Sequence, residues 1–108
     1  MDEKNDNEVA WERLCHYGIN TISWSPGHDI ESNLRRLDFR FKDADDKTVL
    51  VEVWLSFHQD ESRYFTSAIP PELEERGIEN VWVTTTTVPH AIHIKMKGQP
   101  EVITLTDY

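Results

Sequence analysis

Residues 37–57 read LDFRFKDADDKTVLVEVWLSF, and this stretch decides the fold. Apolar and polar residues alternate on both sides of an acidic segment, and a period of two places each set on one face of a sheet. The pattern therefore predicts two long strands joined by an acidic turn. In the second strand Leu50 and Trp54 add apolar residues to the face opposite the valines. A strand that is apolar on both faces is usually central, so we expect it to be covered on both sides.

Shorter patterns surround this hairpin. Helices are predicted at residues 8–17, 29–36 and 70–76, and further strands at 19–24, 81–87, 92–97 and 102–106. Residues 58–69 show no period, so an irregular connection is expected there. The order of elements predicts an α+β fold, with a mainly antiparallel sheet of about five strands and two or three short helices on one face. Residues 1–7 are expected to form a disordered tail and residues 8–108 a single domain.

The charge of the chain is strongly negative and unevenly distributed. The formal net charge is −9 over 108 residues, and all of it comes from residues 1–79, because residues 80–108 hold two acids and two lysines. Negative charge repels phosphate backbones, so direct binding to nucleic acid is not expected. The same charge would attract a basic protein surface, although it also keeps a small domain in solution.

The cysteine count and the hydropathy pattern restrict the compartment. Cys15 is the only cysteine, which excludes an intramolecular disulfide and fits the cytoplasm. Its position in the 8–17 helix suggests a buried thiol. No apolar run approaches the length of a membrane span, so no contact with a membrane is predicted.

Two carboxylates of the hairpin, Asp38 and Glu52, suggest a metal site, because hard cations such as Mg²⁺ bind carboxylate oxygens. The stretches 37–39 and 51–54 resemble the metal-binding hairpin of the PD-(D/E)XK nuclease family. The resemblance implies that Asp38 and Glu52 would bind metal and that a lysine would follow two residues after the glutamate. Trp54 stands at that position, and Leu37 stands where the pattern has proline. A nuclease-like domain, or an inactive relative of one, is therefore the alternative function.

No other pattern in the sequence indicates catalysis. There is no Gly-x-Ser-x-Gly motif and no glycine-rich phosphate loop, and the cysteine and histidine residues do not have the spacing of a zinc site. We therefore predict no catalytic residue, no metal ligand and no cofactor, and we do not expect an enzyme.

The acidic clusters are the preferred candidates for a binding site. They lie in the hairpin turn, in the 58–69 connection and in the 70–76 helix: Asp43, Asp45, Asp46, Asp60, Glu61, Glu72, Glu74 and Glu75. Carboxylates spaced along a surface can imitate the phosphates of a nucleic acid. The leading hypothesis is a small acidic inhibitor or immunity-type protein that binds a basic partner, such as a nucleic-acid-binding or toxic enzyme.

Two further associations are compatible with the sequence. Threonines on both faces of the 81–87 strand indicate an exposed sheet edge, through which a homodimer could form. Alternatively, the chain could be a subunit of a larger assembly. A large exposed apolar patch would favour that interpretation.

Overall fold

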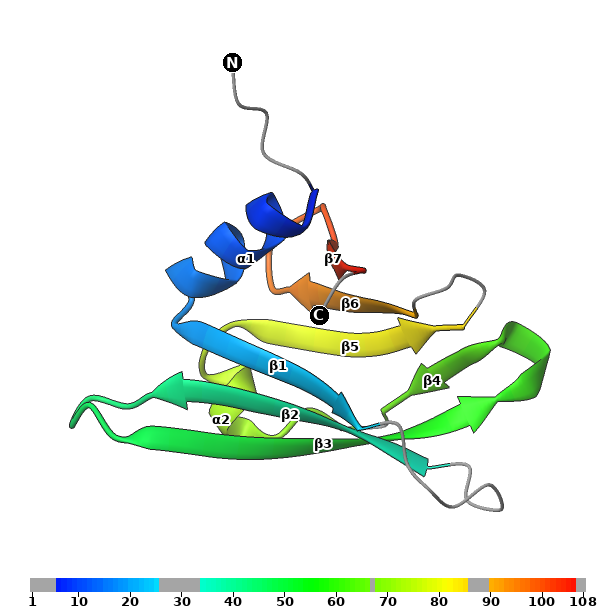
Figure 1. Cartoon of the computed structure of the whole chain (residues 1–108), viewed down its shortest axis with the longest axis horizontal. Coiled ribbons are helices and arrows are strands. Elements are labelled where there is room, and N and C mark those ends of the chain that lie inside the picture. The colour runs from blue at the N-terminus through cyan, green and yellow to red at the C-terminus, as the bar shows by residue number, and fades with distance from the viewer. Residues whose placement is uncertain (1–5, 26–33, 67, 86–89, 107–108) are drawn as a thin grey trace.

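The fold is a single sheet of seven antiparallel strands, curled into a half-barrel. It is seen in a computed structural model that describes residues 6–25, 34–66, 68–85 and 90–106 (Figure 1). The strands are β1 (Ile19–Ser25), β2 (Leu34–Lys42), β3 (Thr48–His58), β4 (Arg63–Phe65), β5 (Ile78–Thr84), β6 (Ala91–Met96) and β7 (Ile103–Leu105). Each strand pairs with the next one in the chain, so the sheet is a meander in sequence order.

The core fills the concave side of this sheet. Alternate residues of every long strand point inward, as the period of two requires, and Phe39, Val53, Val81 and Ile94 are all buried. Leu14 of α1 and Leu73 of α2 complete this core and are fully buried as well. The valine face predicted for the second hairpin strand is therefore confirmed as core.

Helix α1 (Asp6–His16) lies across the open side of the half-barrel, against β1 and β7 (Figure 1). Ala10 and Leu14 face the core, whereas Cys15 is exposed, which corrects the expected buried thiol. Asn7, the last residue of the predicted tail, is part of α1 instead. Its Oδ1 accepts hydrogen bonds from the backbone N–H and the hydroxyl of Thr106 at 3.0 and 3.3 Å. These bonds fix the start of α1 to the end of β7. The predicted tail otherwise falls on residues 1–5, outside the described residues.

The acidic turn between β2 and β3 is held by its first residue. Oδ1 of Asp43 accepts the backbone N–H groups of Asp45 and Lys47, each at 2.9 Å. Asp46 adopts a left-handed conformation with φ of 61°, which aspartate tolerates better than most residues. Asp43 is therefore a structural residue of the turn, while Asp45 and Asp46 are exposed.

Helix α2 (Pro71–Glu74) is only four residues long and connects to the body of the protein through Arg76. The guanidinium donates to the carbonyl oxygens of Tyr17 at 3.2 Å and Lys42 at 2.8 Å, and it lies 3.9 Å from the centre of the Phe41 ring. Arg76 thus joins the ends of α1, β2 and α2. Gly77 follows with a positive φ of 96°, the left-handed conformation in which glycine commonly ends a helix.

The predicted fold class is wrong in its balance of helix and sheet. Seven strands replace the expected five, and α1 is the one substantial helix among the described residues. Residues 34–36 of the predicted 29–36 helix belong to β2, where Leu34 pairs with Ser56, and the rest of that helix lies outside the described residues. The connection expected to be irregular contains the 3-10 helix η1 (Gln59–Glu61) and strand β4. The conformation of these segments depends on pairing with neighbouring strands, and local periodicity does not reveal such pairing.

The threonine-rich strand is also not an edge. It forms β5, which pairs with β4 on one side and with β6 on the other, and the two edges of the sheet are β1 and β7. Thr86 and Thr87, which suggested the edge, lie outside the described residues.

Candidate functional site: the outer face of the β2–β3 hairpin

Four large hydrophobic residues are exposed among those that the structure describes, and three of them lie on the outer face of one hairpin. They are Leu34 on β2 and Leu50 and Trp54 on β3, with exposed fractions of 47, 49 and 53%. The sequence pattern predicted that this second face of β3 would be covered, and in the isolated chain it is not. Exposed apolar residues that gather on one face commonly mark a site of protein interaction. We call this surface, formed by the outward side chains of β2 and β3, the hairpin face.

Asp38 and Glu52 are opposite each other on the hairpin face, as predicted, but a guanidinium lies between them. Nε of Arg36 is 2.8 Å from Oδ1 of Asp38, and its Nη1 is 3.6 Å from Oε1 of Glu52. Arg36 also lies over the ring of Trp54, at 5.7 Å from the ring centre. An arginine thus occupies the place where a metal would have to bind both carboxylates. The two carboxylates form ion pairs with Arg36 and so orient its guanidinium, which in turn packs on the ring of Trp54.

A hollow of about 480 Å³ lies beside Trp54 at the far end of the hairpin face. The residues that line it include Trp54, Phe65, Glu61 and His58. His58 and Phe65 contact each other edge to face, with 5.1 Å between ring centres. Aromatic rings next to a carboxylate suit a cationic side chain, because the ring faces and the carboxylate both attract positive charge.

The predicted acidic residues do not form one continuous surface. Asp45 and Asp46 come just before β3, and Asp60 and Glu61 come just after it. A strand of 11 residues is roughly 33 Å long, and its two ends lie far apart (Figure 1). Both groups flank the hairpin face. The three α2-region glutamates are exposed, and Glu74 is paired with Lys97 of the β6–β7 connection at 3.2 Å.

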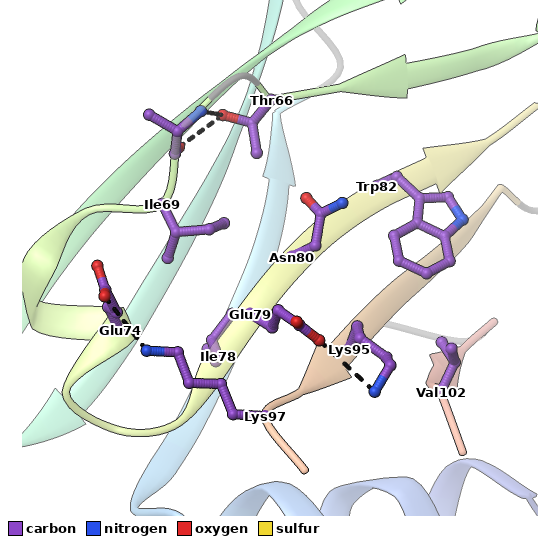
Figure 2. Close-up of a pocket in the computed structure, with 11 residues that line it drawn as sticks. Thr66, Ile69, Glu74, Ile78, Glu79, Asn80, Trp82, Lys95, Lys97 and Val102 are labelled. Carbon is purple, nitrogen blue, oxygen red and sulfur yellow. Dashed lines mark hydrogen bonds and ion pairs between the residues drawn. The ribbon is translucent and has the colours of Figure 1, made fainter. Parts of the chain in front are cut away.

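The larger pocket lies elsewhere, on the outer side of β5 and β6, and measures about 730 Å³ (Figure 2). Asn80 and Trp82 reach into it from β5, and Ile69 faces them from the segment before α2. Both lysines that line it are held by carboxylates: Lys97 by Glu74, and Lys95 by Glu79 at 3.6 Å. Lys95 also donates to the carbonyl of Gln99. Because its charges are balanced internally, this pocket offers less to a charged ligand than the hollow beside Trp54.

His93 connects three strands next to this pocket. Its Nε2 lies 3.0 Å from the hydroxyl of Thr84 on β5, and its Nδ1 lies 3.0 Å from the hydroxyl of Thr104 on β7. The ring also stacks on Trp82, with 5.4 Å between ring centres. Burial, and to a smaller extent the positive charge of Arg63, lower the pKa of His93 below its ordinary value of 6.5.

This lowered pKa predicts that His93 makes stability depend on pH. The unfolded chain binds the proton more readily than the folded one, so the contribution of His93 is complete above pH 6.5 and is lost as the pH falls below it. We expect the difference in unfolding free energy between wild type and His93→Gln to be larger at pH 8 than at pH 5, measured by urea denaturation. His58→Gln, at an exposed site, is the control. Parallel pH profiles of wild type and His93→Gln would contradict this assignment.

Trp54, and Tyr64 with Phe65, are aromatics that the sequence offers as anchors of an interface, although core packing was the preferred role of Trp54. That preferred role is wrong, because Trp54 is 53% exposed. The signal for exposure was the outward face of β3, which Trp54 shares with Glu52 and Ser56, both typical of a solvated face. Among the described residues, no group of three or more histidine, cysteine or acidic side chains could hold a metal ion. No helix in this part of the chain has the length and apolarity needed to cross a membrane.

Comparisons with protein-family models, with curated proteins and with solved structures found no match to this chain.

Proposed function

We propose that this protein is a non-enzymatic binding protein that attaches to a basic protein partner through the hairpin face. The observation that carries the proposal is the exposed Trp54 beside a hollow that also contains Phe65 and Glu61. A partner's lysine or arginine side chain would enter this hollow, contact both rings and pair with the carboxylate. Leu34 and Leu50 would supply apolar contact around this anchor, as in the centre of many interfaces.

The distribution of charge supports a basic partner. Asp45 and Asp46 lie at one end of the hairpin face and Asp60 and Glu61 at the other, so an acidic group flanks its apolar centre at each end. Acidic groups in these positions would speed the encounter with a positively charged surface. A cytoplasmic location and a role as an inhibitor of a nucleic-acid-binding or toxic enzyme belong to the same proposal. The single cysteine is compatible with a reducing compartment.

The test compares proteins retained from an extract of the native source by the immobilised wild type and by two variants. Trp54→Ala should weaken binding of the true partner by roughly 30-fold, the effect of losing an interface anchor. Asp45→Lys should slow association on the order of tenfold at low salt, with a flatter salt dependence. Asp43 is not reversed, because its side chain holds the turn.

Glu101→Lys is the matched control, since it makes the same charge change at an exposed residue away from the hairpin. It should leave the affinity within about twofold of wild type. The proposal would be contradicted if the wild type and the Trp54→Ala, Asp45→Lys double variant retained the same set of proteins. So would a retained partner whose binding responds equally to Asp45→Lys and Glu101→Lys.

A further inference from the structure

Strand β3 is paired along most of its length on one side only. With β2 it pairs from Thr48 to Ser56, but with β4 it pairs only from Ser56 to His58. Strand β4 ends at Phe65. The hydroxyl of the next residue, Thr66, donates to the carbonyl of Ala68 at 2.9 Å. Residues 48–55 of β3 therefore have no neighbouring strand on the side away from β2, within the part of the chain that the structure describes.

The register of the hairpin shows which backbone groups face that side. The backbone N–H of Asp43 donates to the carbonyl of Lys47 at 3.0 Å, which makes these two residues a hydrogen-bonded pair. Hydrogen-bonded pairs alternate with non-hydrogen-bonded ones in an antiparallel ladder. Val49, Val51 and Val53 thus bond to β2, and the N–H and C=O groups of Leu50 and Glu52 point the other way.

Leu50 and Glu52 receive no backbone hydrogen bond from any other described segment. Both residues are also exposed. Unpaired N–H and C=O groups on a strand edge are a template for a further strand. The same residues carry side chains of the hairpin face, so an added strand would contact Leu50, Glu52 and Trp54 directly.

We propose that the partner binds as an extended segment that adds a strand to this free edge of β3, an inference that rests on the proposed function. The partner's segment would lie beside residues 48–55 of β3, in line with β4 and beyond the end of β4 at Phe65. Its outward residues would be apolar opposite Leu50 and Trp54 and basic opposite Glu52, because directly opposed side chains on one face of an antiparallel pair are neighbours. Backbone pairing supplies affinity in this mode, and the alternate side chains supply specificity.

Charge argues against a second copy of this chain as the occupant. An antiparallel pair of β3 strands centred on Glu52 would place the two Glu52 carboxylates opposite each other, which is destabilising. Each copy also carries a net charge of −9. A basic extended segment is complementary where a second copy is not.

Amide hydrogen exchange followed by NMR in the free protein tests the edge. The amides of Leu50 and Glu52 should exchange on the order of 100-fold faster than those of Val49, Val51 and Val53. Equal protection of both sets in the monomer overturns the proposal. If these amides are protected and sedimentation shows a dimer, the edge is occupied by a second copy of the chain, and that result also overturns the proposal.

The probe for binding is a heptapeptide in which valine, arginine and valine alternate with threonine. It should slow exchange at Leu50 and Glu52, and it should bind on the order of tenfold more tightly than the same peptide N-methylated at the valines and arginine, which cannot donate to the edge. Equal binding of the methylated peptide would overturn strand addition while leaving the proposed function intact. Equal binding of a peptide with glutamate in place of arginine would contradict the proposed preference for a basic partner. Absence of any protection at Leu50 and Glu52 by the unmodified peptide at millimolar concentration also overturns strand addition.

Discussion

Leu55→Ala is expected to lower the free energy of unfolding by about 2–5 kcal/mol, whereas Trp54→Ala should lower it by about 1 kcal/mol or less. The two residues are adjacent on β3 but point to opposite faces of the sheet. Leu55 is fully buried, and alanine there would leave a cavity in the core. Trp54 is 53% exposed, so its replacement removes mainly the contact with Arg36. Urea denaturation of the two variants measures both values.

A second adjacent pair provides the control for this contrast. Val51 is buried and Leu50 is 49% exposed, so Val51→Ala should again cost more than Leu50→Ala although valine is the smaller residue. If Trp54→Ala were as destabilising as Leu55→Ala, the hairpin face would be buried in the free protein. That result would also remove the surface on which the proposed function depends.

The same two residues show what the sequence could and could not predict. Alternation in residues 37–57 predicts β2, β3 and the buried valines correctly, because the period of two is a local property of a strand. Whether the opposite face is covered depends on segments far away in the chain. Leu50 and Trp54 produce the same pattern whether a helix of this chain or a different protein lies on them.

Short elements and distant pairs were beyond prediction for a related reason. Strand β4 has only three residues, too few to show a period, and exists because both β3 and β5 bond to it. Among the candidate site residues, Glu74 meets Lys97 across 23 positions, and Arg36 closes the space between Asp38 and Glu52. The composition of these clusters was visible in the sequence, but their partners were not. Lys97 comes from the β6–β7 connection, and Arg36 lies in β2 where a helix was expected.

Arg76→Ala should lower the free energy of unfolding by about 2 kcal/mol, a large effect for a charged residue outside the core. The substitution removes the hydrogen bonds to the carbonyls of Tyr17 and Lys42 and the stacking on Phe41. Arg76→Lys should recover less than half of this loss, because a single ammonium cannot reach both carbonyls in the planar geometry of a guanidinium. Arg40→Ala, at an exposed position on β2, should cost less than about 0.5 kcal/mol.

Gly18 allows this role of Arg76 to be isolated. Its φ of +82° is left-handed, and a Cβ built there would collide with Nη1 of Arg76. Gly18→Ala should therefore cost about 1–2 kcal/mol for the backbone conformation, with a further loss because the guanidinium is displaced. In an Arg76→Ala background only the backbone part should remain, so the two substitutions should couple by about 1 kcal/mol in a double-mutant cycle. Costs that add within about 0.3 kcal/mol would show that Arg76 does not hold the junction of α1, β2 and α2 in solution.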